Sequence, residues 1–304
     1  MSGNFRQMKR RILNIAVFRK ETLYQKMRAL IIYLVISAVF IGCTPILSID
    51  ASTQNVYHFS DTDKNISLLD ISETFGTYDG SFVLYDNNLD SWKIYDLEEA
   101  TKRIPPESTY KIYDALLGLE SGIITPEHSS MTWNGDAFPF PSWEADQDLN
   151  SAMQNSVNWY FQAIDSQLGI NRVQEFLNKI EYGNQTTSSN LDLYWSDFSL
   201  KISPLEQVTL LKKFNTNEFH LNFQNVFSVK NAIKIASTPN GNFYGKTGTG
   251  RVNGQDINGW FIGYVETSDN SYYFATNIQS DSNATGKKAF EITSDILKKL
   301  HIWN

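Results

Sequence analysis

Residues 105–111 of the chain read Pro-Pro-Glu-Ser-Thr-Tyr-Lys and hold the most informative pattern in the sequence. The two prolines suit a helix start, and Tyr110 to Leu119 has the composition of a helix. Ser108 therefore falls in the first turn, and three residues of helix bring its hydroxyl onto the same face as the Lys111 amine. This spacing predicts a serine nucleophile with a lysine base, provided that burial keeps the lysine deprotonated. The same turn supplies backbone N–H groups that stabilise an oxyanion.

Two further polar motifs follow downstream. Lys246-Thr247-Gly248 comes directly after the strand-like Phe243-Tyr244, and Ser156-Val157-Asn158 lies between it and Ser108. Each motif alone is a weak signal, but together they have the order of the serine penicillin-recognising signature. A lysine and a threonine on an edge strand supply a positive field and a hydroxyl donor for a β-lactam carboxylate, and Gly248 allows the substrate backbone to approach.

The sequence after residue 72 predicts strands at both ends and helices between them. Aromatic and β-branched residues alternate in the expected strands, apolar residues recur at i, i+3, i+4 and i+7 in an expected helix, and a capping box lies at Ser203-Pro204-Leu205-Glu206. Strands are expected at 81–85, 92–95, 243–247, 259–266 and 272–277, and helices at 110–119, around 173–180, after 203 and at 287–300. This order predicts an α+β fold with one mixed antiparallel sheet flanked by helices.

With these motifs the chain resembles the class D β-lactamase fold, and more closely the BlaR and MecR type β-lactam sensor-transducers of Gram-positive bacteria. The resemblance extends beyond the three motifs to Tyr182-Gly183-Asn184, Leu193-Tyr194-Trp195 and the segment Asn258 to Gly263. It also includes the basic stretch Arg10 to Ile15 and the apolar segment that follows it.

The resemblance implies a role for each matching residue. Ser108 would be acylated, Lys111 would be the base in an N-carboxylated form derived from CO₂, and Ser156 would carry a proton to the β-lactam nitrogen. Trp195 would hydrogen-bond the lysine carbamate. Lys246, Thr247 and Gly248 would line the substrate side, with the backbone N–H groups of Ser108 and Thr249 as the oxyanion hole. The arginine that binds the substrate carboxylate in many class D enzymes has no counterpart near Gly286-Lys287-Lys288.

Asn158 favours a receptor over a hydrolase. Class D hydrolases usually have valine at this position, whereas the sensors have asparagine. An amide beside Lys111 hydrogen-bonds the decarboxylated amine and favours loss of CO₂ after acylation, so that no base remains to release the acyl group. Two alternatives stay open, a membrane-bound class D β-lactamase and a D-Ala-D-Ala transpeptidase, which shares the three motifs.

Charge is distributed unevenly along the 304 residues. The first 46 residues contain eight Lys and Arg against Glu21 alone, so they carry +7 and the acidic remainder carries −14. The acidic part is unsuited to nucleic acid, which requires Lys and Arg clusters. The single Cys43 excludes an internal disulfide, and neither the cysteine nor the four histidines form a metal-binding motif.

The apolar run from Ala29 to Ile49 has no charged residue and is long enough to cross a bilayer. The basic residues before it place residues 1–28 in the cytoplasm, with 29–49 as a transmembrane helix, 50–72 as an extracellular linker and 73–304 as the penicillin-binding sensor domain. An alternative is lipidation of Cys43 in Phe40-Ile41-Gly42-Cys43. The resemblance also implies a cytoplasmic metalloprotease, as another portion or subunit of the same transducer, so the chain has the character of the C-terminal part of a longer protein.

Overall fold

The computed structural model describes residue 27, residues 55–60 and residues 64–304. The predicted transmembrane segment at 29–49, Cys43 and nearly all of the basic segment lie outside the described residues. Among the residues that are described, none belongs to a helix with the length and hydropathy needed to cross a membrane. The chain from Thr53 to Asn304 forms one unit, and the following description concerns that unit.

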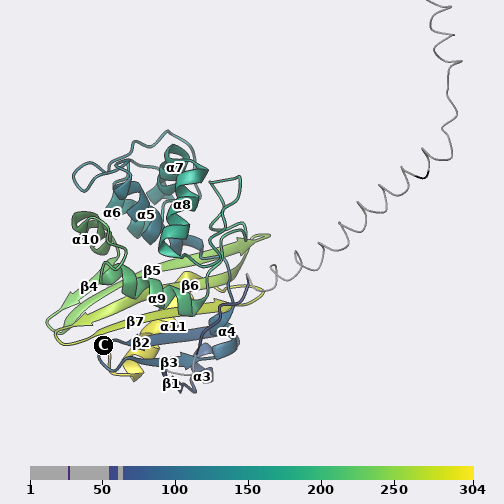
Figure 1. Cartoon of the computed structure of the whole chain (residues 1–304), viewed down its shortest axis with the longest axis vertical. Helices are drawn as coiled ribbons and strands as arrows, with labels where there is room; N and C mark the ends of the chain where they lie inside the picture. Colours follow the sequence, from purple (N-terminus) through teal and green to yellow (C-terminus); the bar gives the residue numbers. More distant parts are fainter. Residues whose placement is uncertain (1–26, 28–54, 61–63) are drawn as a thin grey trace, which may run out of the picture. The chain divides into compact units, whose positions relative to one another are not determined.

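A seven-stranded sheet forms the centre of this unit, in the order β1-β3-β2-β7-β6-β5-β4 (Figure 1). Its strands are β1 (Asn65–Leu68), β2 (Asp79–Asp86), β3 (Ser91–Tyr95), β4 (Lys234–Thr238), β5 (Gly241–Val252), β6 (Gln255–Thr267) and β7 (Ser271–Gln279). β1 and β3 are parallel and every other neighbouring pair is antiparallel, so the predicted mixed sheet and the β2–β3 hairpin are confirmed. β1 lies within the segment that was expected to be a linker.

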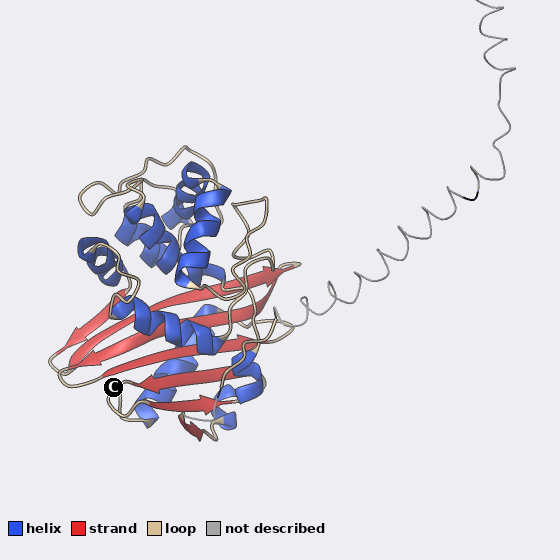
Figure 2. Ribbon diagram, viewed as in Figure 1, coloured by secondary structure: helices blue, strands red, loops and turns tan. Residues whose placement is uncertain are grey.

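Helices cover both faces of the sheet (Figure 2). α11 (Gly286–Lys299) packs on one face, and α9 (Pro204–Asn215) packs on the other. A group of helices continues beyond α9, and short helices complete the fold. These elements are α3 (Ser72–Phe75), α4 (Leu97–Thr101), η1 (Glu107–Tyr110), α5 (Lys111–Glu120), η2 (Pro141–Trp143), α6 (Leu149–Asn155), α7 (Asn158–Leu168), α8 (Ile170–Ile180) and α10 (Phe223–Ala232).

The alternation of side chains along the strands separates two hydrophobic cores. Phe82 and Leu84 of β2 point into the core shared with α11, whereas Val83 and Tyr85 point into the larger core shared with the helical group. Within the smaller core, Ile296 of α11 is 1% exposed. Truncating it to alanine is expected to cost about 2–5 kcal/mol of stability, because the cavity left behind refills only partly.

The sequence signals for helix ends agree with the structure. Ser203 caps α9, accepting from the Glu206 backbone N–H, while the Glu206 carboxylate accepts from the Ser203 backbone N–H. The helix expected at 110–119 is α5, preceded by the 3₁₀ turn η1 that contains Ser108. The signal from the prolines therefore marks the start of η1, one turn before the α-helix begins.

The outer edge of β5 is only partly covered. β4 pairs with Gly241 to Tyr244, and the Gly245 N–H still donates to the Ile233 carbonyl at 2.9 Å. Among the described strands, none pairs with residues 246–250 of β5 on that side. The sheet therefore presents an open edge at the position of Lys246-Thr247-Gly248.

Candidate active site

Ser108 and Lys111 lie at the junction of η1 and α5. The Lys111 Nζ donates to the Ser108 Oγ at 2.8 Å, which confirms that the helical spacing brings the two groups together. Ser108 is half-buried, whereas Lys111 has no exposed surface. The hydroxyl therefore faces the cleft while the amine lies behind it, an arrangement in which a neutral lysine can take the serine proton.

Burial changes the acid–base behaviour of Lys111. Its removal from water lowers the pKa of the amine to about 7, with smaller opposing contributions from Asp114, Glu107 and Asp165. The Nζ lies 5.6 Å from the ring centre of Phe161 and 5.5 Å from that of Trp195, so aromatic rings form much of its surroundings. The lowered pKa makes the neutral amine, the form that a general base requires, accessible near neutral pH.

The second motif meets the first at this amine. The Lys111 Nζ donates to Asn158 Oδ1 at 2.7 Å, from the first residue of α7. Ser156 ends α6 in a left-handed conformation, with φ of 56°, and this reversal turns its hydroxyl toward β5. The structure therefore brings Ser156 and Asn158 to opposite sides of a short connection, one facing Lys246 and the other facing Lys111.

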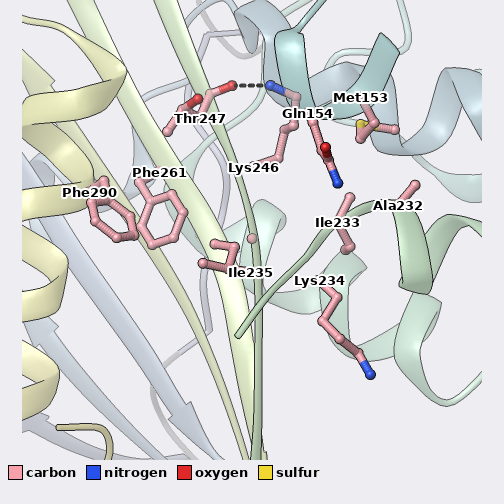
Figure 3. A pocket seen from close by; sticks show the side chains of 11 residues that line it. Met153, Gln154, Ala232, Ile233, Lys234, Ile235, Lys246, Thr247, Phe261 and Phe290 are labelled. Atoms are coloured by element: carbon pink, nitrogen blue, oxygen red, sulfur yellow. Dashed lines mark hydrogen bonds between the residues drawn. The ribbon is translucent and has the colours of Figure 1, made fainter. Parts of the chain in front are cut away.

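Lys246 completes the chain of polar groups from the sheet side. Its Nζ donates to Ser156 Oγ at 2.8 Å and to the Thr247 carbonyl at 2.9 Å, the contact drawn in Figure 3. Burial lowers the pKa of Lys246 well below its usual value, and the nearby Lys111 lowers it further. A lysine of lowered pKa beside a serine hydroxyl can pass a proton to that hydroxyl.

Gly248 and Thr249 place the backbone of β5 beside the nucleophile. A Cβ on Gly248 would lie 3.3 Å from the Ser108 nitrogen and 3.1 Å from the Pro106 oxygen, so the two backbones approach closely. Because the Gly245 N–H points away from β6, toward Ile233, the alternation along a strand directs the N–H groups of Thr247 and Thr249 to the same side, where the edge is open. This geometry fits the pair of oxyanion donors expected from Ser108 and Thr249.

These groups line a cleft of about 340 Å³. Ser108, Ser156, Asn158, Thr247, Gly248 and Thr249 all contribute to its surface, together with Phe140, Ser142, Trp143, Asn155, Arg251 and Asp256. Trp195 is not among the lining residues, because it is only 2% exposed and lies beside the Lys111 amine. A second cavity of about 330 Å³ borders Lys246 and Thr247 between α6, β4, β5 and Phe290 of α11 (Figure 3).

No arginine takes the expected carboxylate-binding position near the start of α11. Instead, the Gly286 N–H donates to Thr249 Oγ1 at 2.8 Å, and a Cβ on Gly286 would lie 2.6 Å from the Gly248 oxygen. The start of α11 therefore supports β5 at close range. The cleft does contain Arg251, whose Nε donates to Asp256 at 2.7 Å.

Sequence reasoning missed three buried carboxyl groups near the site. Glu107, directly before the nucleophile, has a left-handed φ of 52° and is 6% exposed, and burial raises its pKa to about 8. Asp114 and Asp165 are completely buried, and both carboxyl groups act on the pKa of Lys111. The spacing of Asp114 three residues after Lys111 was a usable signal, because that position shares its helix face. Glu107 gave no such signal, since acidic residues are ordinary at helix starts.

Comparisons with known proteins place the site in context. The family described as "Penicillin binding protein transpeptidase domain" matches residues 83–298. "Regulatory protein BlaR1" of Bacillus licheniformis is 43% identical over 99% of this chain and 50% of that protein. "Methicillin resistance mecR1 protein" of Staphylococcus aureus is 37% identical over 97% of this chain and 50% of that protein. The chain thus spans about half the length of the curated relatives that it matches.

Solved structures agree with these matches. The C-terminal domain of the Bacillus licheniformis BlaR penicillin-receptor has a TM-score of 0.77 and 45% identity, and the match covers 80% of this chain and 99% of that one. "Class D beta-lactamase BAT-2" has a TM-score of 0.73 and 36% identity, covering 78% of this chain and 97% of that one. The expected class D type of α+β fold is confirmed.

Proposed function

Since the chain belongs to the penicillin-binding transpeptidase family, in the branch of the class D β-lactamases and the BlaR penicillin-receptor domain, we propose that it is a β-lactam receptor. Acylation of Ser108 by the antibiotic would be the recognition event, and a long-lived adduct would be the signal that induces resistance. The proposal is supported most directly by the hydrogen bond between Lys111 Nζ and Asn158 Oδ1 at 2.7 Å.

Acylation adds the Ser108 O–H across the strained carbon–nitrogen bond of the β-lactam. The neutral Lys111 amine takes the proton as Oγ bonds to the carbonyl carbon, and the N–H groups of Ser108 and Thr249 stabilise the negative oxygen. The carbon–nitrogen bond then breaks, and the ring nitrogen receives a proton through the Ser156 hydroxyl, which Lys246 contacts at 2.8 Å. Lys246 and Thr247 attract the antibiotic carboxylate at the open edge of β5.

Release of the acyl group requires a base that activates water, and this is the step that Asn158 opposes. The pocket fits N-carboxylation of Lys111 in one respect, because the lowered pKa supplies the neutral amine that adds CO₂. When bound, the carboxyl group would supply an anionic oxygen that can accept a proton from water. Asn158, however, presents a carbonyl oxygen to Nζ, and this acceptor stabilises the unmodified amine or ammonium. Asn158 thereby favours a Lys111 that cannot release the adduct.

Intact-protein mass spectrometry after a pulse of benzylpenicillin tests the receptor function. The expected result is a protein heavier by the whole antibiotic, with the added mass on Ser108 and persisting for many minutes. Complete loss of the added mass within seconds would instead establish a class D β-lactamase. The Ser108→Ala variant, which lacks the nucleophilic oxygen, should remain unlabelled and serves as the control.

We further propose that the receptor is anchored in the membrane of a Gram-positive bacterium through residues 29–49, with the penicillin-binding part outside. The apolar run and the basic residues before it support this topology. A cytoplasmic metalloprotease portion or subunit would receive the signal. Membrane fractionation of cells that express the full chain, followed by protease treatment of intact cells, tests the topology. The protein should remain in the membrane fraction, and its outer part should be digested.

A further inference from the structure

Two buried aspartates lie below the contact between Lys111 and Asn158. Asp114 follows Lys111 by three residues on α5, and Asp165 follows Asn158 by seven residues on α7. Both spacings keep a pair of residues on one helix face, and α5 packs against α7. Both aspartates therefore lie in the interface between α5 and α7, where their charges act on the Lys111 amine. Both are completely buried.

The hydrogen bonds around the two carboxyl groups are few and unequal. Tyr194 Oη donates to Asp165 Oδ1 at 3.3 Å, whereas neither oxygen of Asp114 accepts a hydrogen bond from the described residues. The second oxygen of Asp165 likewise has no hydrogen-bond partner among the described residues, and the two carboxyl groups are close enough to affect each other's ionisation. Burial raises the pKa of both groups, and the repulsion between two nearby carboxylates adds to this effect at Asp114. The Tyr194 hydroxyl favours ionisation of Asp165.

We propose that Asp114 and Asp165 are positioning residues that share one proton and hold a single negative charge beneath Lys111. In this arrangement Asp114 is the acid and donates to the Asp165 carboxylate, which also accepts from Tyr194. The charge biases Lys111 toward its amine and ammonium forms and against the N-carboxylated form. The inference rests on the proposed function, because it identifies a second cause, besides Asn158, of a persistent adduct.

The charge balance of N-carboxylation explains the bias. The lysine amine adds CO₂ and releases one proton, so a neutral –NH₂ becomes an anionic –NH–COO⁻. A fixed negative charge nearby opposes this new anion and stabilises the ammonium cation. Residues three apart on a helix have Cβ atoms about 5–6 Å apart, and a charge in that range shifts a pKa by about one unit or more. The other charged or titratable groups that act on the aspartates or Lys111 are Glu107, Lys246, Asp192, Tyr110 and Tyr160.

Two matched amide substitutions test the shared proton. In Asp114→Asn the amide replaces the acid as the donor to Asp165, so the negative charge remains. In Asp165→Asn the charge disappears, because Asp114 then has no charged partner and stays protonated. Each unacylated protein is equilibrated with ¹³C-labelled bicarbonate, and the lysine carbamate is measured by ¹³C NMR. We expect the carbamate-to-amine ratio to rise about tenfold in Asp165→Asn and to change less than twofold in Asp114→Asn.

Equal changes in both variants, or no change in either, would overturn the proposal, because a purely structural role does not distinguish them. If Asp165→Asn does not fold, Asp165→Ser decides, because it removes the same carboxylate and leaves a smaller polar side chain. This variant should also raise the carbamate ratio about tenfold, and an unchanged ratio would count against the proposal. All these measurements use protein without antibiotic, so they are independent of whether the Ser108 adduct persists.

Discussion

Replacing Asn158 by valine removes the one acceptor that α7 offers to Lys111. The lost contact is the 2.7 Å hydrogen bond from Nζ to Oδ1, and Val has nearly the same volume as Asn, so the packing around it changes little. A hydrogen bond to a charged group contributes about 1.5–3 kcal/mol, which corresponds to about one to two pKa units. Because the oxygen stabilises the ammonium, its loss lowers the lysine pKa further. The bias against N-carboxylation weakens by the same factor.

The expected result is a gain of β-lactamase activity. The Asn158→Val protein should hydrolyse nitrocefin at least tenfold faster, and the benzylpenicillin adduct seen by mass spectrometry should decay correspondingly faster. Asn155→Val is the matched control, because Asn155 lines the same cleft but donates to Ser151 of its own helix. The reasoning would be refuted if the adduct of Asn158→Val lasted as long as that of the native protein while acylation remained normal.

Three further predictions concern the pH dependence, a buried acid and the proton path. The acylation rate with a fluorescent penicillin should rise about tenfold per pH unit below about 7 and level off above it, because Lys111 loses its proton in this range. A flat profile from about pH 5.5 to 8 would contradict the role of Lys111 as the general base. Between about pH 4.5 and 8, Glu107 is protonated in the folded protein but ionised in the unfolded chain, because burial raises its pKa to about 8. The native protein therefore loses stability as pH rises through this window. In urea unfolding, Glu107→Gln should therefore gain about 2–4 kcal/mol relative to the native protein between pH 5 and 8, and a pH-independent difference would exclude this explanation. Ser156→Ala and Ser156→Gly should both slow acylation about 100-fold or more, because both lack the hydroxyl that Lys246 contacts. A native acylation rate in the glycine variant alone would instead assign the effect to the left-handed backbone of residue 156.

Much of the fold follows from local patterns in the sequence. The strands of the β2–β3 hairpin alternate between two cores, and the helix after Ser203 carries both halves of a capping box, so their positions were predictable. β1 was not, because its residues are largely exposed and its strand is defined by parallel pairing with β3, a contact between distant parts of the chain. Local composition does not contain that information.

The site was predictable where residues share a motif and not where they meet through packing. The Lys111 and Ser108 contact follows from helix geometry, whereas the contact of Ser156 with Lys246 joins residues 90 positions apart and was expected only from the family resemblance. The buried acids show the same limit. Asp165 becomes part of the lysine environment only because α7 packs against α5, and nothing in its own neighbourhood along the chain indicates that partner.

Because the edge of β5 is open, hydrogen exchange of its amides can report antibiotic binding without any label on the antibiotic. In the free protein the Thr247 and Thr249 amides point away from β6 and toward the edge that β4 leaves uncovered, so their hydrogens should exchange readily with deuterium from the solvent. An acyl group held by the Thr249 N–H shields that amide, while amides of β2 in the middle of the sheet keep their slow exchange. Deuterium uptake at one strand edge would thus follow the lifetime of the bound antibiotic in real time, even in a mixture of penicillins.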